Sequence, residues 1–209
     1  MSSNTLSTDP RIADVLAYWL GSAHPDNAGA LARRQLWFVK SDATDAEIRQ
    51  RFGPLVEEAL AGHLDGWAAT PLGRLALLVL LDQFTRNLFR GTPRSFAGDP
   101  QALRLALQGM DLGHDRHADL PDVARIFCYL PLEHAEDMAL QDRSVAAFQA
   151  LADGADDGTR EFLAGTLDYA HRHREVIARY GRFPHRNPIL GRPSTPEESH
   201  YLAQPGSGF

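Results

Sequence analysis

The stretch that decides the fold is Leu75-Ala-Leu-Leu-Val-Leu-Leu-Asp-Gln-Phe-Thr-Arg-Asn-Leu-Phe-Arg90. Its first part, residues 75–81, is apolar on every side of a helix, and such a segment is normally buried. The continuation carries five polar side chains, which are Asp82, Gln83, Arg86, Asn87 and Arg90. Because unpaired polar groups are costly near a core, these side chains must find partners.

Working outward from this stretch, helix signals recur along the chain, and convincing strand alternation is missing. Capping residues precede apolar residues at helical spacing. The expected starts are Thr8-Asp9-Pro10, Thr44 with Glu47, Thr70-Pro71, Asp99-Pro100, Asp157 or Thr159, and Ser194-Thr-Pro-Glu197. Gly21 and Gly181 are natural helix stops, and a further helix should end near Gly109. The pattern predicts an all-α fold of about eight helices.

Proline interrupts one of the expected helices, which begins at Asp122. Pro131 lacks a backbone donor and clashes with the carbonyl four residues earlier. We therefore expect a kink or a fresh helix start just before His134.

Bulk composition favours one globular domain over residues 1–209, with residues 203–209 as a loose tail. Of the 209 residues, 44% are hydrophobic, which is ample for a sizeable core, and no long linker divides the chain. The net charge of -6 argues against a general nucleic-acid binder, which needs excess Lys and Arg.

Targeting signals are also missing from the sequence. The first ten residues lack the basic start and apolar stretch of a signal peptide, and no apolar run is long enough to cross a membrane. A single cysteine, Cys128, lies in an apolar run and is expected to be buried. The sequence thus predicts a soluble, cytoplasmic protein without a membrane partner.

The first polar motif follows residues 75–81 directly. Asp82, Arg86 and Arg90 are four residues apart and share a helix face, with Gln83 and Asn87 in the adjacent row. Two arginines one turn apart form a fork-shaped receptor for carboxylate or phosphate. The alternative is an Asp82–Arg86 pair that supports neighbouring loops, and Asp99 nearby is most simply a helix cap.

The second motif follows Pro131. His134, Asp137 and Gln141 share a helix face, with Glu133 and Glu136 beside them. A histidine oriented by a carboxylate suits a general acid or base. The alternative is a structural His134 that bridges to a neighbouring helix. No third metal ligand accompanies the pair, so we predict no metal.

The third motif joins one helix to a loop near the C-terminus. His173 lies on the apolar stripe of its helix and suits a core histidine, whereas His171 points elsewhere. The loop is stiffened by prolines and carries five donors, which are Arg182, His185, Arg186, Asn187 and Arg192. It can hold these donors in fixed directions for a ligand. Alternatively, the arginines pair with Asp82, Glu136 or Asp137 and lock the terminal segment onto the bundle.

Three long motifs carry a resemblance to a known family. They are Leu81-Asp-Gln-Phe-Thr-Arg-Asn-Leu-Phe-Arg-Gly-Thr, Leu130-Pro-Leu-Glu-His-Ala-Glu-Asp with Gln141, and Gly181-Arg-Phe-Pro-His-Arg-Asn with Leu190-Gly-Arg. In this order they resemble the bacterial family known as domain of unknown function 924. The resemblance implies a tetratricopeptide-like bundle or arch of antiparallel helix pairs, and it implies no activity. Glu133 and Ala135 depart from the Met and Ser that the family pattern suggests.

Two functional hypotheses follow from the motifs. The first is a buried pocket for a small anionic ligand, in an enzyme that uses acid–base chemistry for hydrolysis, elimination or isomerisation without a cofactor. Its candidate catalytic residues are His134, Asp137 and His185. Its candidate ligand-binding residues are Asp82, Gln83, Arg86, Asn87, Arg90, Glu136, Gln141, Arg182, Arg186 and Asn187. The second is a non-catalytic helical scaffold that binds a peptide or protein partner on a concave face.

Overall fold

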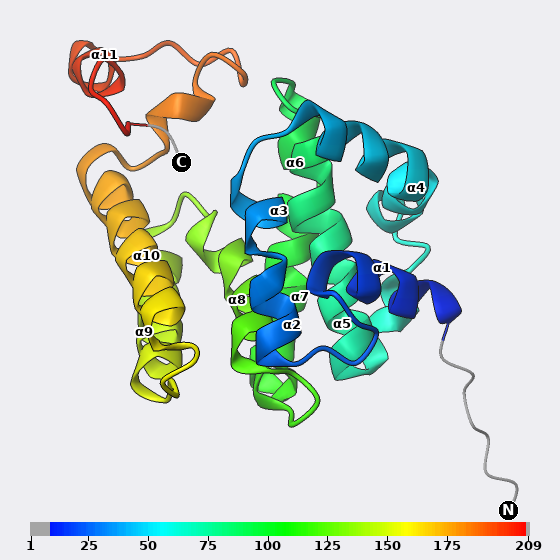
Figure 1. Cartoon of the computed structure of the whole chain (residues 1–209). Coiled ribbons are helices and arrows are strands. Elements are labelled where there is room, and N and C mark those ends of the chain that lie inside the picture. Colours follow the sequence, from blue (N-terminus) through cyan, green and yellow to red (C-terminus); the bar gives the residue numbers. More distant parts are fainter. Residues whose placement is uncertain (1–8, 208–209) are drawn as a thin grey trace, which may run out of the picture.

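The computed structural model describes residues 9–207, and over this range the chain is helical without strands (Figure 1). The first helices are α1 (Pro10–Leu20), α2 (Asn27–Ala32), α3 (Arg34–Phe38), α4 (Asp42–Leu60) and α5 (Pro71–Leu78). The later ones are α6 (Thr85–Leu88), α7 (Asp99–Asp111), α8 (Asp122–Glu133), α9 (Met138–Asp153), α10 (Arg160–Tyr180) and α11 (Pro196–Leu202). The all-α prediction is confirmed. The described range holds more helices than the eight expected, because short helices such as α3 and α6 carry little periodic signal.

Shorter helical turns connect these elements. Four are 3₁₀ turns: η1 (Asp65–Ala69), η3 (Pro93–Phe96), η4 (His114–Arg116) and η5 (Pro184–Arg186). The fifth, η2 (Val79–Phe84), is a π-helical segment that joins α5 to α6. Segments of this type are frequent at functional sites.

Capping explains most of the helix ends. Asp9, Thr70 and Thr195 cap α1, α5 and α11 as predicted, while Thr8 lies outside the described residues. The prediction for α4 was wrong, because Ser41 caps it by accepting a hydrogen bond from the Thr44 backbone. A Ser41 cap satisfies the exposed backbone donors one turn earlier than a Thr44 cap.

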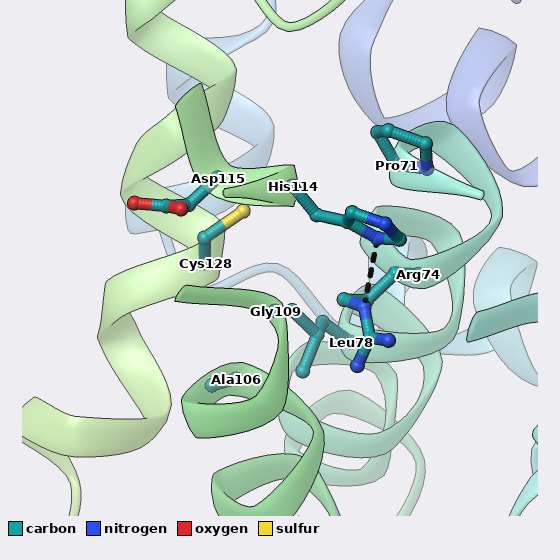
Figure 2. Close-up of a pocket in the computed structure, with 8 residues that line it drawn as sticks. All are labelled: Pro71, Arg74, Leu78, Ala106, Gly109, His114, Asp115 and Cys128. Carbon is teal, nitrogen blue, oxygen red and sulfur yellow. Dashed lines mark hydrogen bonds between the residues drawn. The ribbon is translucent and has the colours of Figure 1, made fainter. Parts of the chain in front are cut away.

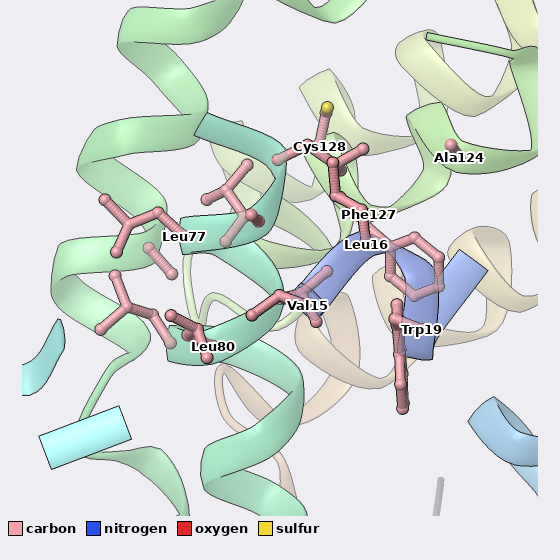
Figure 3. Packing of buried hydrophobic residues seen from close by; sticks show 14 of the residues in the cluster. Val15, Leu16, Trp19, Leu77, Leu80, Ala124, Phe127 and Cys128 are labelled. Atoms are coloured by element: carbon pink, nitrogen blue, oxygen red, sulfur yellow. The ribbon is translucent and has the colours of Figure 1, made fainter. Parts of the chain in front are cut away.

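The core packs α1, α4, α5 and α8 around aromatic side chains. Trp19 of α1 is 1% exposed. Its ring centroid lies 5.3 Å from that of Phe84 and 5.8 Å from that of Phe127. In Figure 3, Leu77 and Leu80 lie on one side of Val15 and Leu16 of α1, and Trp19 lies on the other. Residues 75–81 are buried all round, as their composition predicts.

The start of α7 comes unusually close to η2. A Cβ atom added at Gly98 would lie 2.1 Å from the carbonyl oxygen of Leu81, which no side chain tolerates. Gly98, rather than Asp99, occupies the cap position of α7, so the predicted role of Asp99 as a cap was wrong. Glycine at this position brings the Asp99 carboxylate close to the residues that follow Leu81.

Helix α8 runs through Pro131 and ends at Glu133, so the proline does not start a new helix. His134 is the C-cap residue that follows α8, and Asp137 caps the N-terminus of α9. Helices α9 and α10 lie side by side at one flank of the molecule (Figure 1). The C-terminal segment then leads from Gly181 through η5 to α11.

Candidate functional site

Asp82 and His134 form a buried pair. Asp82 is 1% exposed, and its Oδ1 lies 2.7 Å from Nδ1 of His134. Burial alone would raise the pKa of the Asp82 carboxyl, but Arg86 and His134 outweigh it and hold that pKa below its usual range. The carboxylate is therefore ionised at neutral pH and accepts the hydrogen on Nδ1.

His134 is held in its neutral form. Burial, followed by the charge of Arg86, lowers its pKa against the opposing effect of Asp82. With the hydrogen on Nδ1, the lone pair lies on Nε2. That atom makes no hydrogen bond with any described residue, and the His134 side chain is 15% exposed. A neutral imidazole with a bonded Nδ1 and an available Nε2 is suited to accept a proton.

Arg86 connects this pair to Asp99. Its Nη1 lies 3.2 Å from Asp82 Oδ1 and 3.0 Å from Asp99 Oδ1. Its Nη2 also donates to Asp99 Oδ2, at 3.2 Å. Burial raises the pKa of Asp99, and Arg86 opposes that shift. Arg86 is thus matched by two carboxylates.

Arg186, on η5, has no such match. It is 7% exposed, and its guanidinium carbon lies 4.8 Å from the ring centroid of Phe96 and 4.5 Å from that of Phe183. Nη1 lies 3.7 Å from Asp99 Oδ2, beyond hydrogen-bond distance. Nε is buried without a partner among the described residues. Burial, then Arg86, lowers the pKa of Arg186 to about 10, so it stays charged at neutral pH.

These contacts close into a circle, which we call the central ring. Its members are Asp82, Arg86, Asp99, Arg186, Phe183, His173 and His134. The centroid of the Phe183 side-chain ring lies 5.5 Å from that of the His173 imidazole, and the His173 and His134 imidazole centroids are 6.3 Å apart. The central ring therefore joins η2 and α6, the start of α7, the end of α8, α10 and η5.

Three more titratable side chains in this region are uncharged at neutral pH. His173 is a member of the central ring, and Glu133 and His185 lie beside it. Burial, then Asp82, raises the pKa of Glu133 to about 8. Burial lowers the pKa of His173 to about 3 and, together with Arg186, lowers that of His185 to about 4. We did not predict Glu133 or His173 as site residues. The apolar stripe of α10 had indicated that His173 is buried.

The second motif is only partly brought together. Asp137 does not orient His134, because α8 ends at Glu133 and the helical spacing of three residues does not extend to Asp137. The Asp137 side chain instead accepts a hydrogen bond from the Leu140 backbone. Gln141 is fully buried and donates to the carbonyl groups of Glu133 and Ala135, which fixes the turn that holds His134.

The first motif is divided as well. Gln83 donates to the Asp82 carboxylate, inside the site. Asn87 and Arg90 turn away to Asp45, at 2.8 and 2.7 Å. Helix α6 ends at Leu88, so Arg90 leaves the helix and does not form a fork with Arg86.

The remaining predicted residues fasten the C-terminal segment. Glu136 accepts from the Phe183 backbone and from Arg192. Arg182 bonds Glu198 at 2.6 Å, and Asn187 donates to the same carboxylate. The alternative interpretation, in which arginines of the loop lock the terminal segment, fits Arg192 and its partner Glu136. These contacts position η5 and therefore Arg186.

Two hollows lie away from the central ring. One is an internal void of about 10 Å³, room for about one water, lined in part by Arg74, His114 and Cys128 (Figure 2). Each guanidinium nitrogen of Arg74 donates a hydrogen bond there, Nε to His114 Nδ1 at 3.2 Å and Nη1 and Nη2 to the carbonyls of Leu105 and Ala68. Burial raises the pKa of the Cys128 thiol to about 12, so it is not a reactive thiolate. The other is an open hollow of about 360 Å³ beside α7.

Within residues 9–207, no cluster of three or more His, Cys, Asp or Glu side chains is placed to hold a metal ion. Over the same range, no helix combines the length and apolar character needed to cross a bilayer.

Comparison with known proteins gives a family and a related structure. Residues 15–206 match the family described as "Bacterial protein of unknown function (DUF924)". A solved structure of a protein of unknown function from Agrobacterium tumefaciens is similar, with 38% sequence identity and a TM-score of 0.75. The match covers 93% of this chain and 99% of that one. No curated protein matches. The chain belongs to the DUF924 family, and the resemblance carried by the three motifs is confirmed.

Proposed function

We propose that this DUF924 protein binds a small anionic molecule at the central ring and moves a proton on it through His134. The observation that carries the proposal is the state of Arg186, a buried guanidinium whose Nε has no partner among the described residues. A buried charge without hydrogen bonds is costly, and an anionic ligand would supply the missing acceptors.

The chemistry proposed for His134 follows from its pairing. Asp82 holds Nδ1 at 2.7 Å, and that leaves Nε2 to accept a proton from the ligand and return it. Arg86 and Asp99 keep Asp82 ionised and fix its orientation. Many hydrolases, lyases and isomerases use such a transfer. No metal or other cofactor is part of the proposal, and neither Asp137 nor His185 is assigned a catalytic role.

A second candidate is a scaffold with a tetratricopeptide-like arch of antiparallel helix pairs, which binds a peptide or protein partner. The side-by-side arrangement of α9 and α10 supports it, as do Phe38 and Val39, which are 59% and 60% exposed. A scaffold does not explain why charged groups gather inside the fold. We therefore favour the small-molecule site.

The expected setting of this function is the cytoplasm. A single buried cysteine suits a reducing compartment. The net charge of -6 supports a small-molecule ligand over nucleic acid.

Thermal unfolding in the presence of propionate, succinate, sulfate and inorganic phosphate tests the proposal. At least one of these anions should raise the unfolding temperature of the wild type beyond the effect of chloride at equal ionic strength. Arg186→Gln should abolish that shift, because it removes the charged donor.

Arg179→Gln is the matched control, since the Arg179 side chain is 59% exposed and pairs with Glu197 away from the site. The control should behave as the wild type does. His134→Gln should keep the shift, because the imidazole moves the proton and does not hold the anion. Equal shifts in wild type and Arg186→Gln, or no shift with any anion, would overturn the proposal.

A further inference from the structure

The charged groups of the central ring are already balanced before any ligand enters. Arg86 and Arg186 face Asp82 and Asp99, so two positive charges meet two negative ones. Arg86 is within 3.2 Å of carboxylate oxygens on both aspartates. Nε of Arg186 is a buried donor without a partner among the described residues, and the Asp99 carboxylate lies 3.7 Å from Nη1 of Arg186. An anion that binds Arg186 must approach Asp99 as well, and a second negative charge on the ligand would have no further cation to compensate it.

The histidines around the ring cannot supply the missing positive charge. His134, His173 and His185 all have a lowered pKa, which lies at about 3 for His173 and about 4 for His185. Burial is the main cause in each case. At neutral pH these rings are uncharged, so they offer no second cation to a dianion.

The surroundings of Arg186 also favour a flat, two-oxygen acceptor. Phe96 and Phe183 lie 4.8 and 4.5 Å from the guanidinium carbon and restrict its movement. A restricted guanidinium presents its N–H groups in one plane, which matches the two oxygens of a carboxylate. A phosphate, by contrast, is held best by donors that converge from several directions.

We infer that the ligand of the central ring is a monocarboxylate, bound through its carboxylate group to Arg186. This inference rests on the proposed function and narrows it from small anions in general to one chemical class. A dianion such as succinate should be excluded by the balanced charges that line the ring, and inorganic phosphate should be disfavoured by its tetrahedral oxygens.

Binding titrations at neutral pH, followed by changes in the protein's amide NMR signals, distinguish these classes. Propionate is the monocarboxylate probe and succinate is the dianionic probe. Inorganic phosphate, a mixture of monoanion and dianion at neutral pH, is the probe with tetrahedral oxygens. Propionate should bind the wild type at least tenfold more tightly than succinate or phosphate. Arg186→Gln should weaken propionate binding on the order of tenfold to a hundredfold.

Arg186→Lys separates a charge effect from a shape effect. Lysine keeps the positive charge but lacks the planar pair of donors, so propionate binding should fall at least tenfold in this variant too. Arg179→Gln should leave every affinity unchanged, and amide spectra check that each variant is folded.

The outcomes separate this inference from the proposed function. If phosphate or succinate binds more tightly than propionate, and that binding depends on Arg186, the inference of a monocarboxylate ligand would be wrong. The proposal of an anion site at Arg186 would still hold. Propionate binding that Arg186→Lys fully preserves would also overturn it. If none of the three probes binds, or if Arg186→Gln leaves the affinities unchanged, both the monocarboxylate inference and the proposed anion site would be wrong.

Discussion

Asp82 brings three partners together at a position that is almost inaccessible to solvent. Its carboxylate contacts His134, Gln83 and Arg86, and it remains ionised because those partners outweigh the cost of burial. Glu133 lies close by and shows the opposite behaviour. Its ion-pairing neighbour among the described residues is His173, with Nδ1 3.1 Å from Oε1, and that imidazole is uncharged at neutral pH. Burial and the charge of Asp82 therefore keep Glu133 protonated. Two acidic residues in one region thus hold different charges at neutral pH.

Glu133→Gln should make the protein less sensitive to rising pH. Folding raises the Glu133 pKa from 4.5 to about 8, so the folded state binds the proton more tightly than the unfolded state. The free energy of unfolding of the wild type therefore loses roughly 1.4 kcal/mol per pH unit from this group between pH 4.5 and 8. Glutamine has no proton to lose, so the variant should gain stability relative to wild type across that window.

Urea unfolding at a series of pH values measures this difference. Comparing the two proteins cancels the titration of histidines that do not contact Glu133. His173 is the exception, because its Nδ1 lies 3.1 Å from Glu133 Oε1, but with a pKa of about 3 it stays uncharged throughout the window. Glu197→Gln is the control, because the Glu197 side chain is 60% exposed and should show no such trend. A difference that stays constant from pH 4.5 to 8 would contradict the account of Glu133.

At the scale of elements, the site depends on the π-helical segment η2 and on its contact with the start of α7. The apolar part of η2 is anchored in the core, which buries Asp82 directly after it. Gly98 then allows α7 to approach the Leu81 carbonyl so closely that Asp99 reaches Arg86. The spacing between two elements therefore sets the geometry of the central ring.

Gly98→Ala should disturb that spacing. The added methyl carbon would lie 2.1 Å from a backbone oxygen that cannot move aside easily. We expect a loss of about 3 kcal/mol in the free energy of unfolding, at the upper end for overpacked sites. The variant should also lose anion binding, because Asp99 and Arg86 shift. Denaturant unfolding and propionate titration measure the two effects.

Gly66→Ala is the matched control, since no atom lies within 4 Å of a Cβ added at Gly66. It should change stability by less than about 1 kcal/mol. Equal stability of Gly98→Ala and Gly66→Ala would refute the close approach.

Sequence reasoning predicted the helices with strong local signals. The caps at Asp9 and Thr70 and the stops at Gly21 and Gly181 are local features, and the structure contains each of them. The π-helical segment η2 could not be predicted, because its wider turn leaves no distinctive spacing in an apolar run. The same limit explains Arg90, whose expected position assumed a helix that in fact ends at Leu88.

At the scale of the whole molecule, one large core runs from α1 to α10. It includes Ile12 at one end of the chain and Ala170 near the other, and a smaller cluster of Val176, Ile177 and Phe183 holds the C-terminal segment. The central ring lies where this segment meets the main body. Arg186 therefore reports on the docking of the C-terminal segment as well as on the ligand.

A shared core predicts one cooperative unfolding transition, which is also what a single domain requires. The three tryptophans, Trp19, Trp37 and Trp67, all precede α5, whereas circular dichroism reports on helices throughout the chain. Tryptophan fluorescence and circular dichroism should therefore give the same denaturation midpoint. Separated midpoints would show that α9 to α11 unfold independently.

Sequence reasoning named parts of the chain that do meet in space, but it did not name every partner. Asp82, Arg86, His134 and Arg186 were each predicted as site residues, and their side chains lie around the central ring. The carboxylate beside His134 was assigned to Asp137, because sequence spacing reveals neighbours within one helix only. Asp82 is 52 positions away from His134, and such a contact leaves no local signal.

The most direct test of the central claim is the ¹⁵N NMR signal of the His134 imidazole. The account predicts a hydrogen on Nδ1 and a pKa below the ordinary value of 6.5. It also predicts that propionate shifts the Nε2 signal in the wild type but not in Arg186→Gln. A His134 with its hydrogen on Nε2, an ordinary pKa and no response to propionate would contradict it.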